Sequence, residues 1–305
     1  MLSAHADTAL LTRTPMLLAH DAASGYLGGG GGVIRWWTQT QSVGLADQLT
    51  CGARAFDARP MLSRSGKLVW HHGPIEINYS FARSLVDLMQ WLRSHPTELV
   101  LLSIWDCVGD GCMEAVGKQL SVHNISTVVD CSELRSLTYS GARARAELPG
   151  GGSLLAITAA QWAPDGAACS VGNYDPTMAC TGRIDGDDDD SSYYGCWLSD
   201  ATRAYPVGRM LEQLDNVTRR GLSDGHFTQA QGLWQESEAS IAIGALRNSS
   251  LLLDQRRSGL NEILAREVAS GRWRGAVNFL EVNDVCDHGA ELAKALTPDL
   301  EPQPG

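Results

Sequence analysis

Six polar side chains suited to acid–base and phosphate chemistry follow three short apolar runs of the sequence. Two histidines with pKa values near neutrality can act as a general base and a general acid, and a fixed guanidinium can stabilise the charge of a phosphate group. Together these groups are equipped to cleave a phosphodiester without a metal ion. The six residues are His20 and Asp21, Asp57 and Arg59, and His71 and His72.

The apolar runs that precede these residues are typical of buried strands in a parallel sheet. Each run is mostly continuous and lacks the alternation of a strand with one face in water. In a closed α/β barrel the carboxyl ends of the strands form the active-site face, so the polar residues would converge there. The predicted strands are Met16–Ala19, Ala53–Ala58, Leu68–Trp70, Leu99–Ile104, Leu154–Thr158 and Ala276–Val282.

Helical patterns alternate with the predicted strands. Apolar residues recur at intervals of three and four residues over Phe81–Ser94, and this pattern stops at His95-Pro96. The alternation of strands and helices indicates an α/β barrel or a doubly wound sheet. The other predicted helices are Ala204–Arg219, Ser240–Leu246 and Leu251–Ala269.

Each candidate site residue also has an ordinary structural interpretation. A single histidine after a strand is more often a hydrogen-bonded structural group, and Asp57 with Arg59 can form a simple ion pair. The functional interpretation depends on the chemistry that the whole set would perform together.

Four blocks of the sequence resemble the X-domain of phosphatidylinositol-specific phospholipase C. They occur in the family's order and at its spacing, and the resemblance is clear from about Pro15 to Asp106. It implies an α/β fold, a distorted TIM (β/α)8 barrel of the phospholipase-C-like phosphodiesterase type. We expect residues 1–305 to form one such domain, with a loop insertion around residues 165–199. The four blocks are Ala19–Asp21, Gln48–Arg59, His71–Pro74 and Leu85–Ser103.

The resemblance implies a role for each of the polar residues. The family cleaves phosphoinositides by attack of the inositol 2-hydroxyl on phosphorus, which gives diacylglycerol and a cyclic inositol phosphate. By this resemblance, His20 would be the general base and His72 the general acid. Arg59 would hold the phosphoryl oxygens. Asp21 would orient the acid and the arginine, with Asp57 beside them.

The second block bears on metal dependence. Calcium-dependent members of the family have Asn after the first catalytic histidine and a Glu-x-Asp pair at the end of this strand, and oxygen ligands of this kind suit a hard cation. This sequence has Asp21 and the pair Asp57-x-Arg59 instead. The resemblance therefore implies the metal-independent bacterial branch, and we expect no metal and no other cofactor.

Three further residues are predicted to bind substrate. Bacterial members have a basic residue near the end of the fourth strand, where this chain has Asp106. The family also orients its general base with a carboxylate late in the barrel, for which Asp284 and Asn283 are the candidates. Glu236, which follows Leu233-Trp234, is expected to line the pocket.

A tryptophan pair and the net charge bear on the surfaces that the protein can bind. Trp36 and Trp37 are predicted to contact a membrane, because tryptophan suits an interface between apolar and wet surroundings. Alternatively, one of the pair packs inside. The formal net charge of −11 argues against nucleic-acid binding and against strongly anionic bilayers. The expected partner is a phospholipid or a GPI-type substrate at a membrane surface.

Cysteines and glycosylation acceptors indicate export. The eight cysteines form an even set, and the pairs Cys107/Cys112 and Cys169/Cys180 bracket short loops that disulfides could close. Buried free thiols and a metal site are the alternatives. No apolar stretch is long enough to span a membrane. We expect a secreted, monomeric glycoprotein whose signal peptide is absent from this sequence. The acceptor asparagines are Asn78, Asn124, Asn216 and Asn248.

Two other functions stay open on the sequence. The barrel can be a binding module that has lost its activity, because a fold does not define a function. It can also be a phosphodiesterase for another lipid head group, since Asp106 departs from the basic residue of the inositol-specific members.

Overall fold

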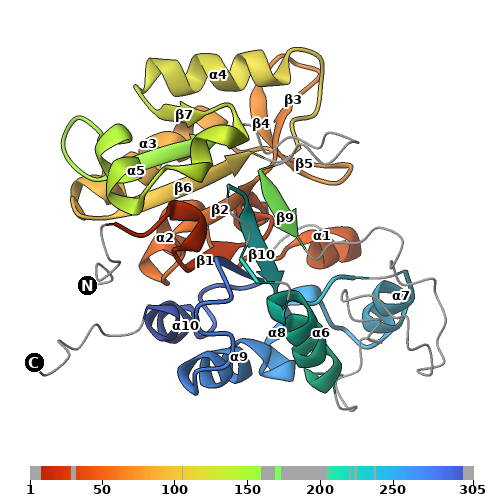
Figure 1. Ribbon diagram of the computed structural model, residues 1–305. Coiled ribbons are helices and arrows are strands. Elements are labelled where there is room, and N and C mark those ends of the chain that lie inside the picture. The colour runs from red at the N-terminus through yellow and green to blue at the C-terminus, as the bar shows by residue number, and fades with distance from the viewer. Residues whose placement is uncertain are drawn as a thin grey trace, which may run out of the picture.

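The computed structural model describes residues 8–28, 32–104, 106–158, 169–172, 205, 207–219, 221–222, 225–236 and 238–297. Its centre is an eight-stranded sheet in which all seven neighbouring pairs are parallel (Figure 1). In spatial order the strands are β7 (Ser126–Val128), β8 (Ser153–Ile157), β6 (Leu99–Ile104), β2 (Ala55–Ala58), β1 (Met16–Ala19), β11 (Phe279–Val282), β10 (Phe227–Gln231) and β9 (Ser170–Gly172).

The α/β class predicted from the sequence is confirmed, with parallel strands and helices in alternation. The end strands of the sheet are β7 and β9, and within the described ranges no backbone pairing joins them. Closure of the sheet into a barrel therefore stays a prediction. The insertion expected around residues 165–199 falls almost entirely outside the described residues, apart from 169–172.

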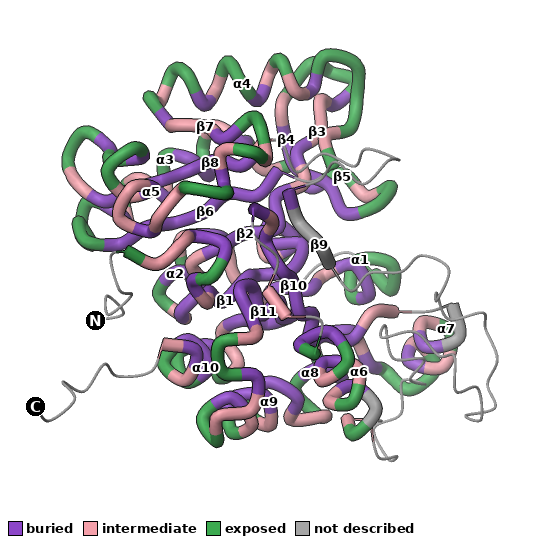
Figure 2. Tube along the Cα trace, in the orientation of Figure 1, coloured by how far each residue is buried: buried purple, intermediate pink, exposed green. Residues whose placement is uncertain are grey.

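Both faces of the sheet are buried, which explains the continuous apolar runs. Successive side chains of a strand point to opposite faces. In β1, Met16 and Leu18 accordingly join one hydrophobic cluster, while Leu17 and Ala19 join another. Figure 2 shows buried strands at the centre and exposed residues on the outer turns of the helices. This two-sided burial is the expected environment of a parallel sheet.

The third predicted strand belongs to a second, antiparallel sheet. This sheet consists of β3 (Pro60–Leu62), β4 (Leu68–His72) and β5 (Ile75–Ile77). The prediction of a parallel strand here is wrong, because the short turn between β3 and β4 returns the chain directly beside itself and leaves no room for a crossover helix. His72 consequently reaches the site from a hairpin.

Helices surround the sheet, and two predicted segments differ in detail from the structure. The helix predicted over 81–94 is confirmed as α3 (Phe81–Arg93), which begins where the Ser80 side chain accepts a hydrogen bond from the Arg83 N–H. The segment predicted as one helix over 251–269 is two, α8 (Leu251–Ser258) and α9 (Leu260–Ala269). Gly259 separates them with a φ of 62°, a left-handed conformation that ends a helix.

The helices predicted over 204–219 and 240–246 correspond to α-helices over 207–219 and 238–246. The remaining helices lie in segments for which the sequence predicted none. Among the described residues, no helix has the length and apolar character needed to cross a bilayer. The α-helices are α1 (Gly32–Thr38), α2 (Leu45–Thr50), α4 (Cys112–Val122), α5 (Tyr139–Arg145), α6 (Val207–Arg219), α7 (Glu238–Leu246) and α10 (Gly289–Leu296). The 3-10 helices are η1 (Leu11–Arg13), η2 (Ala22–Leu27) and η3 (Cys131–Arg135).

Three disulfides join segments of the described chain. Cys107–Cys112 is confirmed as predicted. Cys169 pairs with Cys131 and not with Cys180, so the second predicted pairing is wrong: β9 brings Cys169 next to η3. The third bond, Cys51–Cys286, links the end of α2 to the segment after β11. Cys180 and Cys196 lie outside the described residues.

Candidate active site

The inward face of several strands changes from apolar to polar towards the carboxyl end. Met16 and Leu18 on β1 lie in an apolar cluster, and His20 follows two residues later on the same face. Ala55 and Asp57 repeat this order on β2, and Phe279 and Glu281 repeat it on β11. The polar residues are thereby gathered above an apolar floor, at the end of the sheet where barrel enzymes place their active sites.

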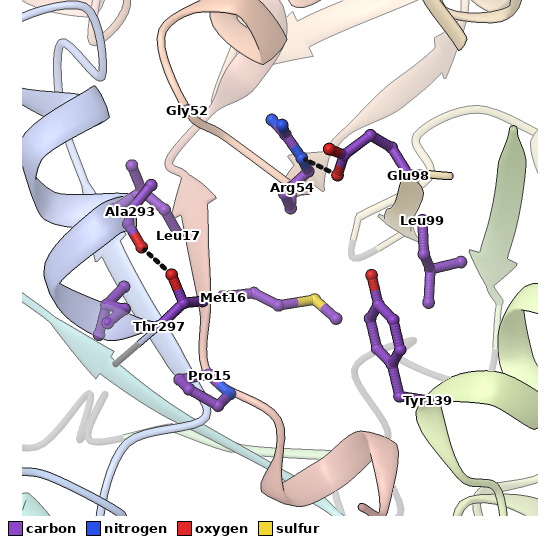
Figure 3. A pocket seen from close by; sticks show the side chains of 11 residues that line it. Pro15, Met16, Leu17, Gly52, Arg54, Glu98, Leu99, Tyr139, Ala293 and Thr297 are labelled. Carbon is purple, nitrogen blue, oxygen red and sulfur yellow. Dashed lines mark hydrogen bonds and ion pairs between the residues drawn. The ribbon is translucent and has the colours of Figure 1, made fainter. Parts of the chain in front are cut away.

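The opposite, amino-terminal end of the strands has a small cavity with different properties (Figure 3). Its lining includes Met16, Tyr139 and the ion pair of Arg54 with Glu98, whose Nε and Oε2 atoms are 2.8 Å apart. The cavity holds about 20 Å³, which is enough for a single water molecule. The cavity contains none of the predicted site residues. In barrel enzymes, residues at the amino-terminal end of the strands usually contribute to stability and not to catalysis.

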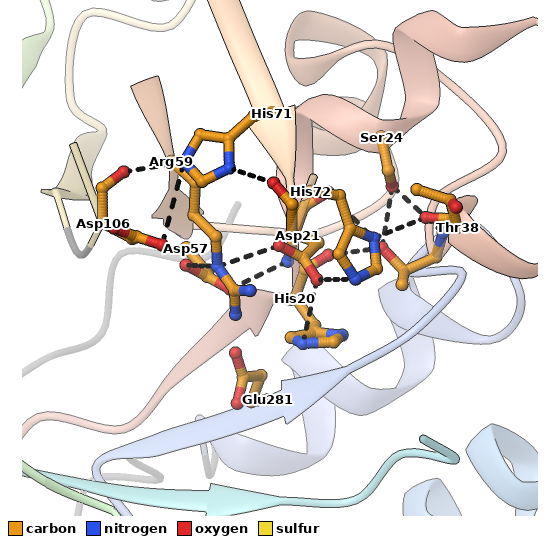
Figure 4. Close-up of polar contacts among 12 residues, drawn as sticks. His20, Asp21, Ser24, Thr38, Asp57, Arg59, His71, His72, Asp106 and Glu281 are labelled. Carbon is orange, nitrogen blue, oxygen red and sulfur yellow. Dashed lines mark hydrogen bonds and ion pairs between the residues drawn. The ribbon is translucent and has the colours of Figure 1, made fainter. Parts of the chain in front are cut away.

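One carboxylate lies at the centre of the predicted residues (Figure 4). Oδ2 of Asp21 is 3.2 Å from Nε2 of His20 and 3.2 Å from Nε2 of His72. Its other oxygen, Oδ1, is 2.9 Å from Nε of Arg59. Two imidazoles and one guanidinium therefore meet at a single buried carboxylate, as the convergence argument predicted.

Asp57 fixes the arginine from the second side. Its Oδ1 accepts a hydrogen bond from Arg59 Nε at 3.1 Å, and its Oδ2 accepts one from the terminal Nη2 at 2.8 Å. Oδ2 also accepts from the backbone N–H of Asp21 at 3.0 Å. Burial alone would lower the pKa of Arg59, but Asp21 and Asp57 outweigh it and raise that pKa. The guanidinium is thus held as a fixed positive charge.

The second ring nitrogen of each histidine defines its orientation. His72 donates through Nδ1 to the backbone oxygen of Thr38 at 2.7 Å. His20 donates through Nδ1 to Oδ1 of Asn283 at 2.8 Å, and the Asn283 amide is oriented by donating to the Trp234 oxygen at 2.7 Å. Because both Nδ1 atoms are occupied as donors, the Nε2 atoms are the ones that can exchange protons in the site.

Two buried side chains of the segment after α1 form hydrogen bonds with the backbone at and beside His20. Thr40 donates through its hydroxyl to the His20 carbonyl oxygen at 2.9 Å. The Gln41 amide donates to the same oxygen and to that of Val282, both at 3.0 Å. Asp21 itself has a left-handed backbone with a φ of 40°, a conformation that costs free energy in a non-glycine residue and recurs at functional sites.

The charges of the site shift the pKa values of its members. Burial alone would raise the pKa of Asp21, but Arg59 and the two histidines outweigh it and lower the pKa to about 2. Burial alone would lower the pKa of His20, but Asp21 and Glu281 outweigh it, so the pKa is raised above 6.5. Asp21 is therefore ionised at all physiological pH values, while the pKa of His20 is raised from its ordinary value.

The three predicted substrate-binding residues lie in different surroundings. Glu236 belongs to the site, with Oε1 at 4.0 Å from Nε2 of His72. Asp106 lies at the rim with a side chain that is 59% exposed. Asp284 lies outside the cluster, where its Oδ2 pairs with Nε of Arg256 at 2.5 Å. Of the two candidates late in the sheet, Asn283 is the one that contacts His20.

The sequence reasoning gave His71 no role of its own and missed the buried residue Glu281. His71 has both ring nitrogens against carbonyl oxygens, those of Gly73 and Asp106, each at 3.0 Å. It thereby ties the strand of His72 to the segment after β6. Glu281 lies below His20 within β11 (Figure 4). An acidic residue inside an otherwise apolar strand was the signal that could have identified it.

The tryptophan pair is divided between the interior and the surface. Trp37 is 1% exposed and does not reach solvent, which corrects the predicted membrane contact for this residue. Val33, Ile34 and Trp36, which precede Trp37 in α1, are exposed, and Ile34 is 67% exposed. The exposed apolar surface of α1 therefore comes from these three residues, which include only one member of the tryptophan pair.

One group of donors in the described chain is close enough to hold a metal ion. It consists of His20, Asp21 and Asp57, whose ligand atoms lie within 4.8 Å of one another. Arg59, however, already neutralises both carboxylates at hydrogen-bond distance. A cation added here would have to compete with a fixed guanidinium, so we assign no metal ligands.

The parallel sheet and its polar edge define an α/β protein. Bacterial phosphatidylinositol-specific phospholipases C are among the solved structures with a similar fold. The protein from Listeria monocytogenes is 16% identical with a TM-score of 0.60, over 96% of this chain and 97% of that one. A double mutant of the Staphylococcus aureus protein is 16% identical with a TM-score of 0.61, over 98% and 96%. The resemblance predicted from the sequence is therefore confirmed in the fold.

Sequence similarity is confined to a shorter segment. The 1-phosphatidylinositol phosphodiesterase of S. aureus strain Newman is 28% identical over 68 residues, which are 22% of this chain and 22% of that relative. The match thus spans about a fifth of the relative's length. No protein-family model matches this chain.

Proposed function

We propose that this protein is a metal-independent phosphodiesterase that cleaves phosphatidylinositol-type or GPI lipids by attack of the inositol 2-hydroxyl on phosphorus. The observation that carries this proposal is the meeting of two imidazoles and one guanidinium at one carboxylate, where the Nε2 atoms of His20 and His72 each lie 3.2 Å from Asp21 and Arg59 lies 2.9 Å from it. The names of the similar bacterial proteins support the same chemistry.

The two histidines divide the proton transfers. His20 Nε2 takes the proton of the 2-hydroxyl while that oxygen forms a bond to phosphorus. The bond from phosphorus to the glycerol oxygen breaks, and His72 Nε2 gives its proton to this leaving oxygen. The products are diacylglycerol and a cyclic inositol phosphate. His72 is held for this task, since Nδ1 donates to Thr38 and Nε2 faces the Asp21 carboxylate.

Arg59 and the two aspartates provide the electrostatics. The guanidinium stabilises the charge that develops on the phosphoryl oxygens, a contribution that is worth about a hundred- to a thousand-fold in rate at comparable sites. Asp21 stabilises the protonated form of both histidines, and Asp57 keeps the guanidinium in place. A divalent cation has no required part in these steps, so a chelator is expected to leave turnover unchanged.

The architecture that we propose around this site is a single distorted (β/α)8 barrel at a membrane surface. Helix α1 ends at Thr38, whose carbonyl oxygen holds His72, so its exposed apolar residues lie beside the site. They are the proposed contact with the lipid. The three disulfides support an exported, oxidised protein. The four acceptor asparagines are exposed, which supports glycosylation.

Substitution of each histidine tests the proposal directly. His20→Gln and His72→Gln should each lower turnover of phosphatidylinositol by at least a hundred-fold. His95→Gln is the control, because the ring of this exposed histidine lies against the backbone and ring of Trp91, just after α3. Equal activity of His95→Gln and either site variant would contradict the proposal.

A second candidate keeps the chemistry and changes the head group. Asp106 and Glu236 are both acidic and lie beside His71 and His72. Carboxylates at these positions disfavour head groups that carry additional phosphates. A panel of lipids with different head groups, assayed for cyclic phosphate products, shows whether the protein cleaves a lipid with an unphosphorylated inositol or one with another head group.

A further inference from the structure

Glu281 is a buried acid that the proposed chemistry does not use. Its side chain lies in the middle of β11, and the residue is 1% exposed. Its Oε2 accepts hydrogen bonds from the amides of Gln229 and Gln231, both at 2.5 Å. These donors are neutral, so no salt bridge within β10 or β11 balances the charge of the carboxylate. A buried carboxylate without a paired cation is costly, so another group must compensate it.

The register of the strands places Glu281 under His20. Leu18 pairs with Glu281 and Ala19 pairs with Val282, so His20 follows one step beyond. The backbone N–H of His20 donates to the Val282 oxygen at 3.1 Å. Asn283, two residues after Glu281 and on the same face, contacts the His20 ring. Figure 4 shows the Glu281 carboxyl directed towards His20 and Arg59.

The charged groups around His20 and Glu281 show what Glu281 adds. His20 faces Asp21, whose Oδ2 lies 3.2 Å from its Nε2, but the same carboxylate is also engaged by His72 and by the Arg59 guanidinium. The acceptor at Nδ1 of His20 is an amide, Asn283, which carries no charge. A protonated His20 therefore shares the charge of Asp21 with two other groups, and Glu281 is a further carboxylate that acts on it and on Arg59.

The titration of the two groups agrees with this arrangement. Burial raises the pKa of Glu281 to about 7, with Asp57 adding to the rise and His20 opposing it. In return, Glu281 is one of the charges that raise the pKa of His20. Each group therefore favours the charged form of the other.

We propose that Glu281 is a positioning residue that supplies, from inside the sheet, a second negative charge that stabilises protonated His20 in addition to that of Asp21. Its part in turnover rests on the proposed function, because the proton affinity of His20 affects turnover only if His20 acts as the base. The electrostatic coupling itself does not depend on any activity. Asn283 offers His20 an uncharged acceptor, and Glu281 supplies the negative charge that Asn283 lacks.

The coupling is measured by following the ring nitrogens of His20 by NMR during a pH titration of the intact protein. In Glu281→Gln the midpoint of His20 should fall by about one pH unit, a tenfold loss of proton affinity, because an opposite charge at close range is removed. His95 should keep its midpoint. Adding Asn283→Asp to Glu281→Gln should restore the midpoint, since the charge returns at the ring itself. An unchanged His20 midpoint in Glu281→Gln would overturn the coupling.

A reciprocal variant guards against a folding defect in Glu281→Gln. With His20→Gln, the carboxyl carbon of Glu281 should titrate at a higher pH than in the unsubstituted protein, because coupling between two sites is mutual. No change in that midpoint would likewise overturn the coupling.

Kinetics then separate the coupling from the proposed function. If phosphatidylinositol is turned over, Glu281→Gln should lower kcat more than it changes KM and should move the acidic limb of the pH–rate profile to lower pH. An unchanged limb would refute a part in turnover. If the unsubstituted protein turns over no phosphatidylinositol, the proposed function fails, and the NMR midpoints alone decide the coupling.

Discussion

At the scale of single residues, Asp21 organises the site. Its two oxygens bind the His20 ring, the His72 ring and the Arg59 guanidinium, and its backbone N–H is held by Asp57. The chemistry of these residues was predictable from their types and their positions after strands. Asn283, His71 and Glu281 were harder to assign, because their roles depend on contacts with strands that are distant in the sequence.

Glu281 should also affect stability in a pH-dependent way. Its pKa is about 7 in the folded protein and 4.5 when unperturbed, so ionisation is disfavoured by folding. Its stabilising contribution is complete below pH 4.5 and is lost as the pH rises through 7. Glu281→Gln should therefore gain up to about 3 kcal/mol in the free energy of unfolding at pH 8 relative to pH 5.

Urea denaturation of both proteins at the two pH values measures this difference. If the free energy of unfolding changed equally between pH 5 and pH 8 in Glu281→Gln and in the unsubstituted protein, the assigned ionisation of Glu281 would be contradicted.

At the scale of elements, one disulfide joins two segments that are far apart in the sequence. Cys51–Cys286 spans 235 residues and joins the end of α2 to the segment after β11, whereas Cys107–Cys112 spans only 5. A crosslink restricts the unfolded chain more when the loop it closes is longer. Replacing both members of Cys51–Cys286 by Ala should cost about 3 kcal/mol more than the same change at Cys107–Cys112.

Thermal and urea unfolding of the two double variants provide the comparison. Each variant loses one bond and two sulfurs, so Cys107→Ala/Cys112→Ala is a matched control. Similar losses in the two variants would show that loop length does not set the contribution of these bonds.

The elements also show where sequence patterns suffice and where they fail. The long amphipathic segment of α3 and the continuous apolar runs of β1, β6 and β11 were predictable, because burial on one or two faces leaves a clear periodicity. The strand at Leu68 was assigned to the wrong sheet. The apolar residues of this strand indicate that it is buried, but the turn before it determines which strand it pairs with. Strands β7 and β10 were missed because they are short or rich in polar residues.

At the scale of the whole molecule, the net charge of −11 and the exposed apolar residues of α1 favour a proposed membrane contact that depends on apolar insertion. Ile34 on α1 is 67% exposed, and Val122 on α4 is 65% exposed. Ile34→Glu should weaken sedimentation with phosphatidylcholine–phosphatidylinositol vesicles at least several-fold, because a charge opposes entry into the bilayer. Val122→Glu should have little effect.

A soluble short-chain substrate separates binding from chemistry in this test. Ile34→Glu should turn it over at the unsubstituted rate, since Ile34 has no place among the groups that transfer protons. Equal vesicle binding by the two variants would exclude α1 as the membrane contact.

The proposed reaction is an internal attack of a neighbouring hydroxyl on phosphorus that needs no metal ion. It is tested by phosphorus NMR of phosphatidylinositol vesicles treated with the protein and an excess of chelator. We expect the signal of a cyclic inositol phosphate, formed together with diacylglycerol and absent with His20→Gln. Loss of turnover on adding chelator, or a product that is acyclic from the start of the reaction, would contradict it.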